Sequence, residues 1–137
     1  IGTELAVRAP ADGHTMLMIS LSTAVNPVLR SKLPYDTAKE LQPLINLAVS
    51  PNILVTHPSV QAKNIAELLA LAKAKPGEIT YASGGTGAAT HLAGELLANM
   101  GGVKMTHVPY KGANPATIDL LGGRVAWMFG TILPTLP

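Results

Sequence analysis

The sequence predicts an α/β fold with a mainly parallel sheet and helices on both faces. From Asn52 onward, short apolar runs alternate with segments of helical periodicity, and glycine or proline pairs separate them. Strands that alternate with helices in this way are joined by crossovers, which makes neighbouring strands parallel. Hydrophobic residues make up 47% of the 137 residues and charged residues 13%, a balance typical of strands covered on both faces.

The first fifty residues predict one strand and two helical turns. The segment Thr3–Ala9 is expected to form a short helix, since a proline follows it. Met16–Ile19 is a continuous apolar run and predicts a buried strand. It leads into Ser20–Thr23, which is expected to be a small polar loop, before Asn26 and the next proline open another helical turn.

The helix expected over residues 65–75 has clear signals at both ends. Asn64 can cap it, Glu67 stands three residues later, and Pro76 follows it. Apolar side chains recur on one face, at Ile65, Leu68, Leu69 and Ala72.

The remaining elements continue the alternation of strand and helix. Strands are expected over residues 53–55, 79–82, 104–108 and 125–129, and helices up to Met100 and over residues 114–121. The helix that ends at Met100 is expected to bury Leu92, Leu96 and Met100, and Gly101 and Gly102 end it. The resulting order is β-α-β-α-β-α-β.

Composition excludes several classes of protein. The chain has ten Lys and Arg and eight Asp and Glu, and the basic residues form no cluster. It also has only one Phe, one Trp and three Tyr on which bases could stack, so no nucleic acid partner is expected. The absence of cysteine excludes disulfides and cysteine-bound zinc. No apolar run reaches the roughly 20 residues of a membrane span, and any export signal would lie outside the sequence.

Ligands of open α/β sheets bind beyond the carboxyl ends of the strands, and three loops qualify: residues 20–26, 83–90 and 109–114. The middle loop has glycines at 84, 85 and 87 ahead of a helix, so its backbone N–H groups can converge on an anion. The hydroxyls of Ser83, Thr86 and Thr90 add neutral donors, which suits a carboxylate. The alternative is that these glycines only permit a tight turn and that the threonines cap the helix.

Catalytic and nucleotide-binding motifs are incomplete. The run that starts at Gly85 has Thr90 where a dinucleotide fingerprint needs its third glycine or alanine, and no acidic residue follows about 20 positions on. Tyr81 stands where a nucleophile elbow before Ser83 requires glycine. The four histidines show no metal-ligand spacing, and His91 could reach an anion or simply pack at the helix start. No enzyme activity, metal or cofactor is therefore expected, and Lys111 is interpreted as a surface lysine.

The order of several short motifs resembles the tripartite tricarboxylate transporter receptors, also called Bug-type solute-binding proteins. The motifs begin at Ala11 (ADGHT), Lys32 (KLPYD), His57 (HPSV), Tyr81 (YASG), His91 (HLAGE), His107 (HVPYKG) and Asp119 (DLLGG). This resemblance covers nearly the whole chain.

The resemblance implies a periplasmic-binding-protein type II-like fold with two α/β lobes, present here as an internal fragment. It assigns residues 1–52 to an incomplete first lobe, 53–134 to most of the second lobe, and 135–137 to the start of a return crossing. The implied function is a periplasmic receptor that delivers a small mono- or dicarboxylate, or an amino acid, to a membrane permease. A sensory receptor that signals to a membrane partner is the alternative.

The same resemblance implies ligand-binding residues in both lobes. The first lobe would contribute Ser22 and Thr23, and the second would contribute Ser83, Gly84, Gly85, Thr86, Gly87 and Ala88. The chain departs from the family pattern at His14, where members usually have Tyr, and at Gly130, where they usually have Asp.

Overall fold

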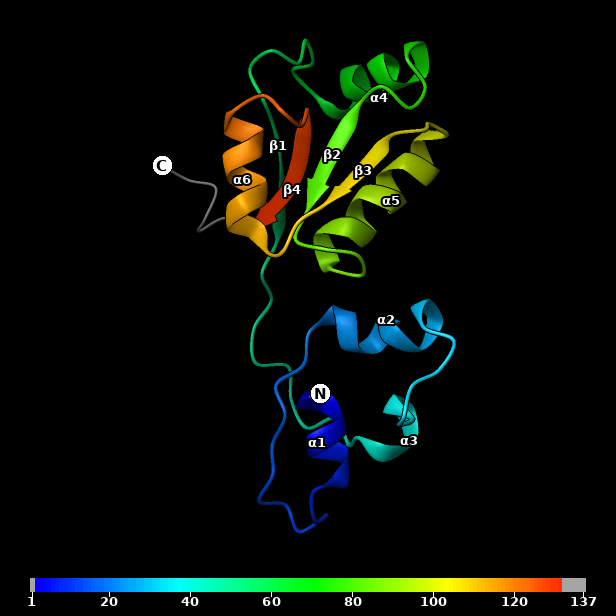
Figure 1. Cartoon of the computed structure of the whole chain (residues 1–137), viewed down its shortest axis with the longest axis vertical. Coiled ribbons are helices and arrows are strands. Elements are labelled where there is room, and N and C mark those ends of the chain that lie inside the picture. The colour runs from blue at the N-terminus through cyan, green and yellow to red at the C-terminus, as the bar shows by residue number, and fades with distance from the viewer. Residues whose placement is uncertain (1, 132–137) are drawn as a thin grey trace. The chain divides into compact units, whose positions relative to one another are not determined.

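The computed structural model describes residues 2–131, which fall into two compact units. The first unit ends at Ala48 and the second begins at Val49, and each is described by itself. Within the described residues the first unit is helical, whereas the second holds the sheet (Figure 1). The return crossing expected at residues 135–137 lies outside the described residues. None of the helices in the described part combines the length and hydrophobicity that crossing a bilayer would require.

The first unit contains helices α1 (Gly2–Arg8), α2 (Leu21–Leu29) and α3 (Thr37–Glu40). The short helix α3 begins at a side-chain cap, because Asp36 Oδ1 accepts the N–H groups of Ala38 at 3.0 Å and Lys39 at 3.3 Å. The helix expected near the N-terminus is confirmed to within one residue.

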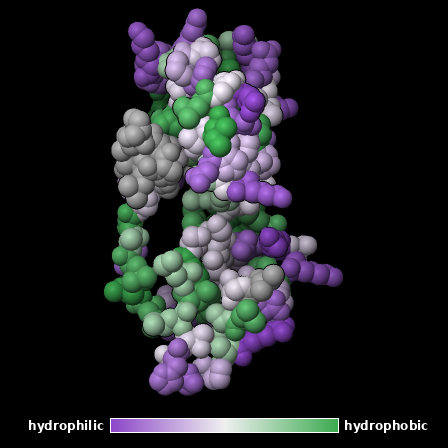
Figure 2. Space-filling model, turned by 60° about the vertical axis from the view of Figure 1, so that its left-hand side comes forward, coloured by the Kyte–Doolittle hydropathy of each residue, from purple (hydrophilic) through white to green (hydrophobic). Residues whose placement is uncertain are grey.

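The strand expected at Met16–Ile19 is wrong. This segment belongs to no strand, and Met16 and Met18 are 80% and 83% exposed. A strand exists only with a hydrogen-bonded neighbour, and no described residue pairs with this segment. Figure 2 shows hydrophobic residues at the surface of the unit that holds α1 to α3.

The polar loop expected at Ser20–Thr23 is also wrong, because Ser20 is the N-cap of α2. Ser22 and Thr23 therefore lie in the first turn of a helix. Pro27 lies inside α2 rather than at the start of a new turn, and the helix ends two residues later.

The second unit is a four-stranded sheet with three helices. The strands are β1 (Asn52–Thr56), β2 (Thr80–Ser83), β3 (Thr106–Pro109) and β4 (Trp127–Thr131), and the helices are α4 (Ile65–Ala74), α5 (Ala89–Gly101) and α6 (Ala113–Leu121). The predicted alternation is confirmed, with strand starts one to two residues from those expected. Helix α6 starts at Ala113, after Gly112 as N-cap, rather than at the expected Asn114.

The strand order is β1-β4-β2-β3, and β2 is parallel to both β3 and β4. Strand β1 is antiparallel to β4, with Asn52 opposite Thr131 and Thr56 opposite Trp127. These two strands are far apart in sequence, so no single crossover fixes their relative direction. The sheet is therefore mixed, although its parallel pairs are those that the helical crossovers predict.

Helices cover both faces of this sheet, as expected (Figure 1). On one face α6 packs through Ala116 and Leu120 against Ala82 and Met128. On the other face the buried residues are Leu68 of α4, Tyr81 and Trp127. Trp127 and Met128 are core residues, as their apolar surroundings in the sequence predict.

The cap expected for α4 is confirmed, since Asn64 Oδ1 accepts the N–H of Glu67 at 3.0 Å. The Glu67 carboxylate in turn accepts the N–H of Lys63 at 2.7 Å. These reciprocal bonds fix the start of the helix.

Three side chains of α5 were expected to be buried, and two of these predictions are wrong, because Leu96 and Met100 are 60% and 78% exposed, whereas Leu92 is half-buried. The helix instead turns Gly94 toward Tyr81 and Leu97 toward the core. The ring of Tyr81 on β2 occupies the space beside Gly94, so at this position the helix approaches the sheet without a side chain.

Candidate functional site

The segment Ser83–Ala88, here called the glycine loop, connects β2 to α5 at the carboxyl end of β2. Gly85 has φ +132° and Gly87 has φ +81°, both in the region that favours glycine. The N–H of Ala88 donates to the carbonyl of Gly85 at 3.1 Å and closes the turn. The glycines therefore allow the chain to reverse from strand into helix within five residues.

Several amides of the glycine loop donate to side chains of the protein itself. The N–H of Gly84 donates to Thr90 Oγ1 at 3.1 Å, and that of Gly85 donates to Ser83 Oγ at 3.1 Å. The N–H of Gly87 donates to His91 Nδ1 at 3.2 Å. These amides stabilise the loop, so in this conformation they are not the ones that face a ligand.

A second set of amides has no acceptor among residues 2–131: Thr86, Ala89, Thr90 and His91. The last three form the first turn of α5, and its N-cap, Ala88, supplies no side-chain cap. The start of a helix also carries the positive end of the helix dipole. This arrangement provides neutral donors for an anion.

The loop after β3 packs against the glycine loop. The N–H of Tyr110 donates to the carbonyl of Ser83 at 3.0 Å, and the N–H of Gly112 donates to that of Gly84 at 3.1 Å. Gly112, with φ +108°, is the N-cap of α6 and also lacks a side-chain cap. The starts of α5 and α6 therefore lie at the same edge of the sheet.

The side chain of Tyr110 is hydrogen-bonded to the carboxylate of Asp119 on α6. Its hydroxyl donates to Asp119 at 2.7 Å, and Asp119 also pairs with Arg124 at 2.6 Å. Burial, and then the hydrogen bond to Asp119, raise the pKa of Tyr110. The hydrogen bonds from Tyr110 and Arg124 lower the pKa of Asp119. This ionised carboxylate links the loop after β3 to the far end of α6.

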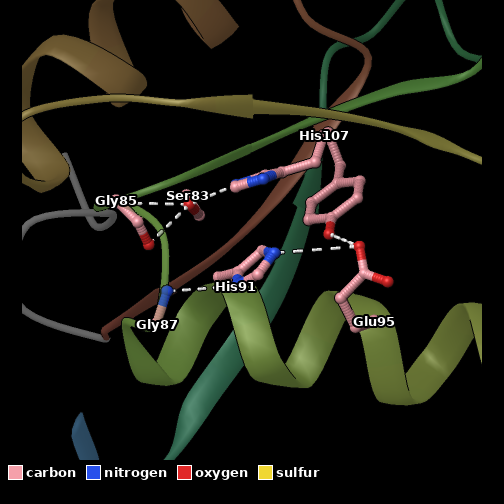
Figure 3. Close-up of polar contacts among 7 residues, drawn as sticks. Ser83, Gly85, Gly87, His91, Glu95 and His107 are labelled. Carbon is pink, nitrogen blue, oxygen red and sulfur yellow. Dashed lines mark hydrogen bonds and ion pairs between the residues drawn. The ribbon is translucent and has the colours of Figure 1, made fainter. Parts of the chain in front are cut away.

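Two stacked imidazoles lie beside the glycine loop (Figure 3). The ring centroids of His91 and His107 are 4.0 Å apart, and the ring of Tyr81 stacks on His107 at 4.9 Å. His107 Nε2 lies 2.6 Å from Ser83 Oγ. Burial lowers the pKa of His107, and the neighbouring His91 lowers it further, whereas Glu95 acts in the opposite direction.

Glu95 completes this group of polar side chains. It accepts a hydrogen bond from the hydroxyl of Tyr81, and its Oε1 lies 3.8 Å from His91 Nε2. Burial, and then the hydrogen bond and charge of Glu95, raise the pKa of Tyr81. The phenol therefore stays neutral at physiological pH.

The pair formed by Ser83 and His107 does not amount to a catalytic centre. Ser83 is fully buried, so a substrate could not reach its hydroxyl. No carboxylate among the described residues hydrogen-bonds to His107, whereas a catalytic triad requires one. In the described part of the chain, no three His, Asp or Glu side chains could together hold a metal ion.

The structure brings six of the residues predicted for the site, Ser83 to Ala88, into one loop. Within it, Ser83 is buried, Thr86 is exposed, and Ala88 is half-buried at the N-cap of α5. Ser22 and Thr23 lie in α2 of the first unit, half-buried. Ligand contact by these eight residues stays a prediction.

Sequence reasoning missed Glu95 and His107, which support the loop from α5 and β3. Glu95 stands four residues after His91 on a helix, a spacing that places both side chains on one face and could have indicated the contact. The position of His107 required the pairing of β2 with β3, which places it opposite Tyr81.

Comparisons with known proteins agree on one family. The family described as "Tripartite tricarboxylate transporter family receptor" matches residues 1–137. A Pseudomonas sp. protein named for the tcbD-tcbE intergenic region is 37% identical over 96% of this chain, and protein BugT of Bordetella pertussis is 38% identical over 92%. The chain spans 39% of the length of each of these two relatives.

Solved structures share the fold over nearly the whole chain. A protein described as a periplasmic transporter is 38% identical, with a TM-score of 0.81 over 96% of this chain and 44% of that one. The structure of R. palustris Rpa4515 with adipate is 32% identical, with a TM-score of 0.82 over 95% of this chain and 44% of that one. MatC from Rhodopseudomonas palustris with bound malate is 26% identical, with a TM-score of 0.79 over 96% of this chain and 45% of that one.

The matching family is one of transporter receptors and not of enzymes, in agreement with the incomplete catalytic motifs of the sequence. The match over all 137 residues, together with relatives more than 30% identical, establishes the relationship. The chain belongs to the family of tripartite tricarboxylate transporter receptors.

Proposed function

We propose that the protein carrying this chain is a periplasmic receptor for a small mono- or dicarboxylate or an amino acid, and that it delivers this solute to a membrane permease. One carboxylate of the solute binds at the start of α5. The observation that carries this proposal is the set of amides at Thr86, Ala89, Thr90 and His91 that have no acceptor among residues 2–131.

The chemistry of these donors favours a carboxylate. All are neutral backbone groups at the positive end of a helix dipole, which stabilises a single negative charge by several hydrogen bonds. The glycine loop contains no Lys or Arg, so no direct ion pair within it is needed for recognition. Lys111, in the loop after β3, is exposed.

Two structural relatives support this ligand class. Rpa4515 was solved with adipate and MatC with malate, and both ligands are dicarboxylates. By analogy, the second carboxylate or another polar group of the solute would be recognised by the rest of the protein. Ser22 and Thr23 are proposed to contribute from the first unit, since the family resemblance assigns them to the ligand.

A thermal-shift series on the protein expressed from its complete gene tests the ligand class. Adipate, malate and glutamate are compared with 1,6-hexanediol, which matches the length of adipate without its carboxylates, and with inorganic phosphate. A ligand present at one hundred times its Kd stabilises the folded state by about 2.7 kcal/mol, a readily measured shift. Stabilisation by the diol or phosphate, with none by any carboxylate, would overturn the proposal.

Delivery to a permease is tested separately in cells. Deletion of the permease genes should abolish uptake of the identified solute while leaving its binding to the purified receptor unchanged. Unchanged uptake in the deletion strain would show that the receptor serves a different membrane partner.

A further inference from the structure

The contact between His91 and the glycine loop fixes the protonation of one ring nitrogen. His91 Nδ1 accepts the N–H of Gly87 at 3.2 Å, which requires a free lone pair on that nitrogen. In the neutral ring the hydrogen therefore lies on Nε2, which is 3.8 Å from the Glu95 carboxylate. The His91 side chain is only 14% exposed, so water cannot readily replace this partner of Gly87.

The second imidazole holds the other side of the loop through Ser83. His107 Nε2 lies 2.6 Å from Ser83 Oγ, and that oxygen accepts the N–H of Gly85 at 3.1 Å. Figure 3 shows His91 directed at Gly87 and His107 directed at Ser83. Each stacked ring is therefore connected to one glycine of the loop.

We propose that His91 is a positioning residue for carboxylate binding: its neutral ring holds the Gly87 amide and so the conformation of the glycine loop, and its protonation releases that amide and weakens binding. The binding part of this proposal rests on the proposed function, whereas the hold on Gly87 does not. His91 acts through the loop, and no contact of its side chain with the solute is required.

The charges around the rings determine where a proton goes. The titratable groups that face His91 are Glu95 on its own helix, His107 on β3, and Tyr81 on β2 behind His107. Glu95 favours a hydrogen on His91 Nε2, so an added proton must go to Nδ1. Two N–H groups would then face each other across 3.2 Å, and the hydrogen bond to Gly87 would be lost.

Only one of the two rings is expected to carry a charge at a time. Their centroids are 4.0 Å apart, and two positive charges at that distance repel. Burial lowers the pKa of His107, so this ring favours the neutral form. The hydroxyl of Ser83 can either donate to or accept from His107 Nε2, so it can bind the neutral and the protonated ring. The backbone N–H of Gly87 can only donate, so it can bind only the neutral ring of His91.

Two substitutions of His91 distinguish the loss of the hydrogen-bond acceptor for Gly87 from the loss of a side chain that can be protonated. In His91→Asn the side-chain oxygen can take the place of Nδ1 but cannot be protonated, whereas His91→Leu supplies no acceptor. At pH 7.5 we expect the Kd for the carboxylate found in the thermal-shift series to change less than about twofold in His91→Asn. In His91→Leu it should rise about three- to tenfold, the usual effect of one lost hydrogen bond.

The pH profile is the readout that a purely structural role would leave unchanged. Between pH 7.5 and 5.5 the Kd of the unmodified protein should rise about three- to tenfold, the effect of the same lost bond, and both variants should show flat profiles. A pH dependence of His91→Asn equal to that of the unmodified protein would overturn the proposal.

His57 provides a matched control. Its Nδ1 accepts the N–H of Ser59 at 3.2 Å, which is the same type of contact. His57 directly follows β1, whose last residue lies opposite the first residue of β4. The glycine loop begins at the last residue of β2, which runs parallel to β4. His57 and the glycine loop therefore lie at opposite ends of the strands. His57→Leu should leave the Kd and its pH profile unchanged, and circular dichroism verifies that every variant is folded.

Nuclear magnetic resonance without ligand tests the hold on Gly87 by itself. The amide signal of Gly87 should shift with the same midpoint as the ring nitrogens of His91, and this shift should disappear in His91→Asn. A Gly87 signal that does not follow the ring would overturn the positioning role. If Gly87 follows the ring but no carboxylate binds, the proposed function fails while the role of His91 in the loop stands.

Discussion

Gly94 of α5 lies directly against the ring of Tyr81 on β2. A methyl group at this glycine would come within 2.9 Å of both Cδ2 and Cζ of the tyrosine. The ring cannot easily move away, because it stacks on Trp127 at 5.0 Å on one side and on His107 at 4.9 Å on the other. The close packing of α5 on the sheet therefore depends on the absence of a side chain at this position.

Gly94→Ala should destabilise the protein. Overpacking costs about 1–3 kcal/mol, which exceeds the gain of about 0.5–1 kcal/mol from replacing glycine by alanine inside a helix. Gly101→Ala is the matched control, because the atom nearest its new methyl group is the flexible end of Leu69. Thermal unfolding should show a clearly lower Tm for Gly94→Ala than for Gly101→Ala, and equal values would contradict the packing argument.

The two adjacent glycines of the loop should differ in their tolerance of alanine. At Gly85 the backbone has φ +132°, and a methyl group would lie 3.2 Å from the carbonyl oxygen of Tyr110. At Gly84 the nearest atoms are at 3.7–3.9 Å, which is ordinary contact.

Gly85→Ala should therefore cost about 1–3 kcal/mol of strain and weaken carboxylate binding, while Gly84→Ala should have little effect on either. Chemical denaturation and calorimetry with the identified carboxylate measure the two effects. Equal losses in both variants would mean that the backbone conformation of Gly85 is not the controlling feature.

Acidification should destabilise the second unit through His107. Burial lowers its pKa from the ordinary value of 6.5, so the unfolded chain binds the proton more readily than the folded chain. The free energy of unfolding should be highest above about pH 6.5 and should fall as the pH decreases toward the lowered pKa.

His107→Gln keeps a polar group near Ser83 but cannot titrate. Denaturation of this variant at pH 7.5 and pH 5.5 should show a smaller loss of stability than the unmodified protein shows. An identical pH dependence in the two proteins would assign the effect to another group.

Lys111→Ala should change the Kd for the carboxylate less than about twofold, because an exposed charge contributes little in water. The neutral amides at the start of α5 should carry the interaction instead. Calorimetry at two salt concentrations tests this directly. A loss larger than that of Gly85→Ala, and one that grows at low salt, would show that an ion pair governs recognition.

The sequence by itself determined the features that depend on local physics. The cap of α4 at Asn64 follows from a side chain and an amide three residues apart, and the alternation of strands and helices follows from the spacing of apolar residues. The position of the glycine loop after β2 could be read in the same way, because left-handed backbone conformations favour glycine.

Only the tertiary structure decided how these elements face one another. The sequence could not show that α5 turns Gly94 rather than Leu96 inward, because Tyr81 of a different strand occupies that space. It could not show that β1 runs antiparallel to β4, since no crossover joins those strands directly. The support of the glycine loop was likewise decided by a residue of another strand: His107 of β3 contacts Ser83, whose hydroxyl oxygen accepts the N–H of Gly85.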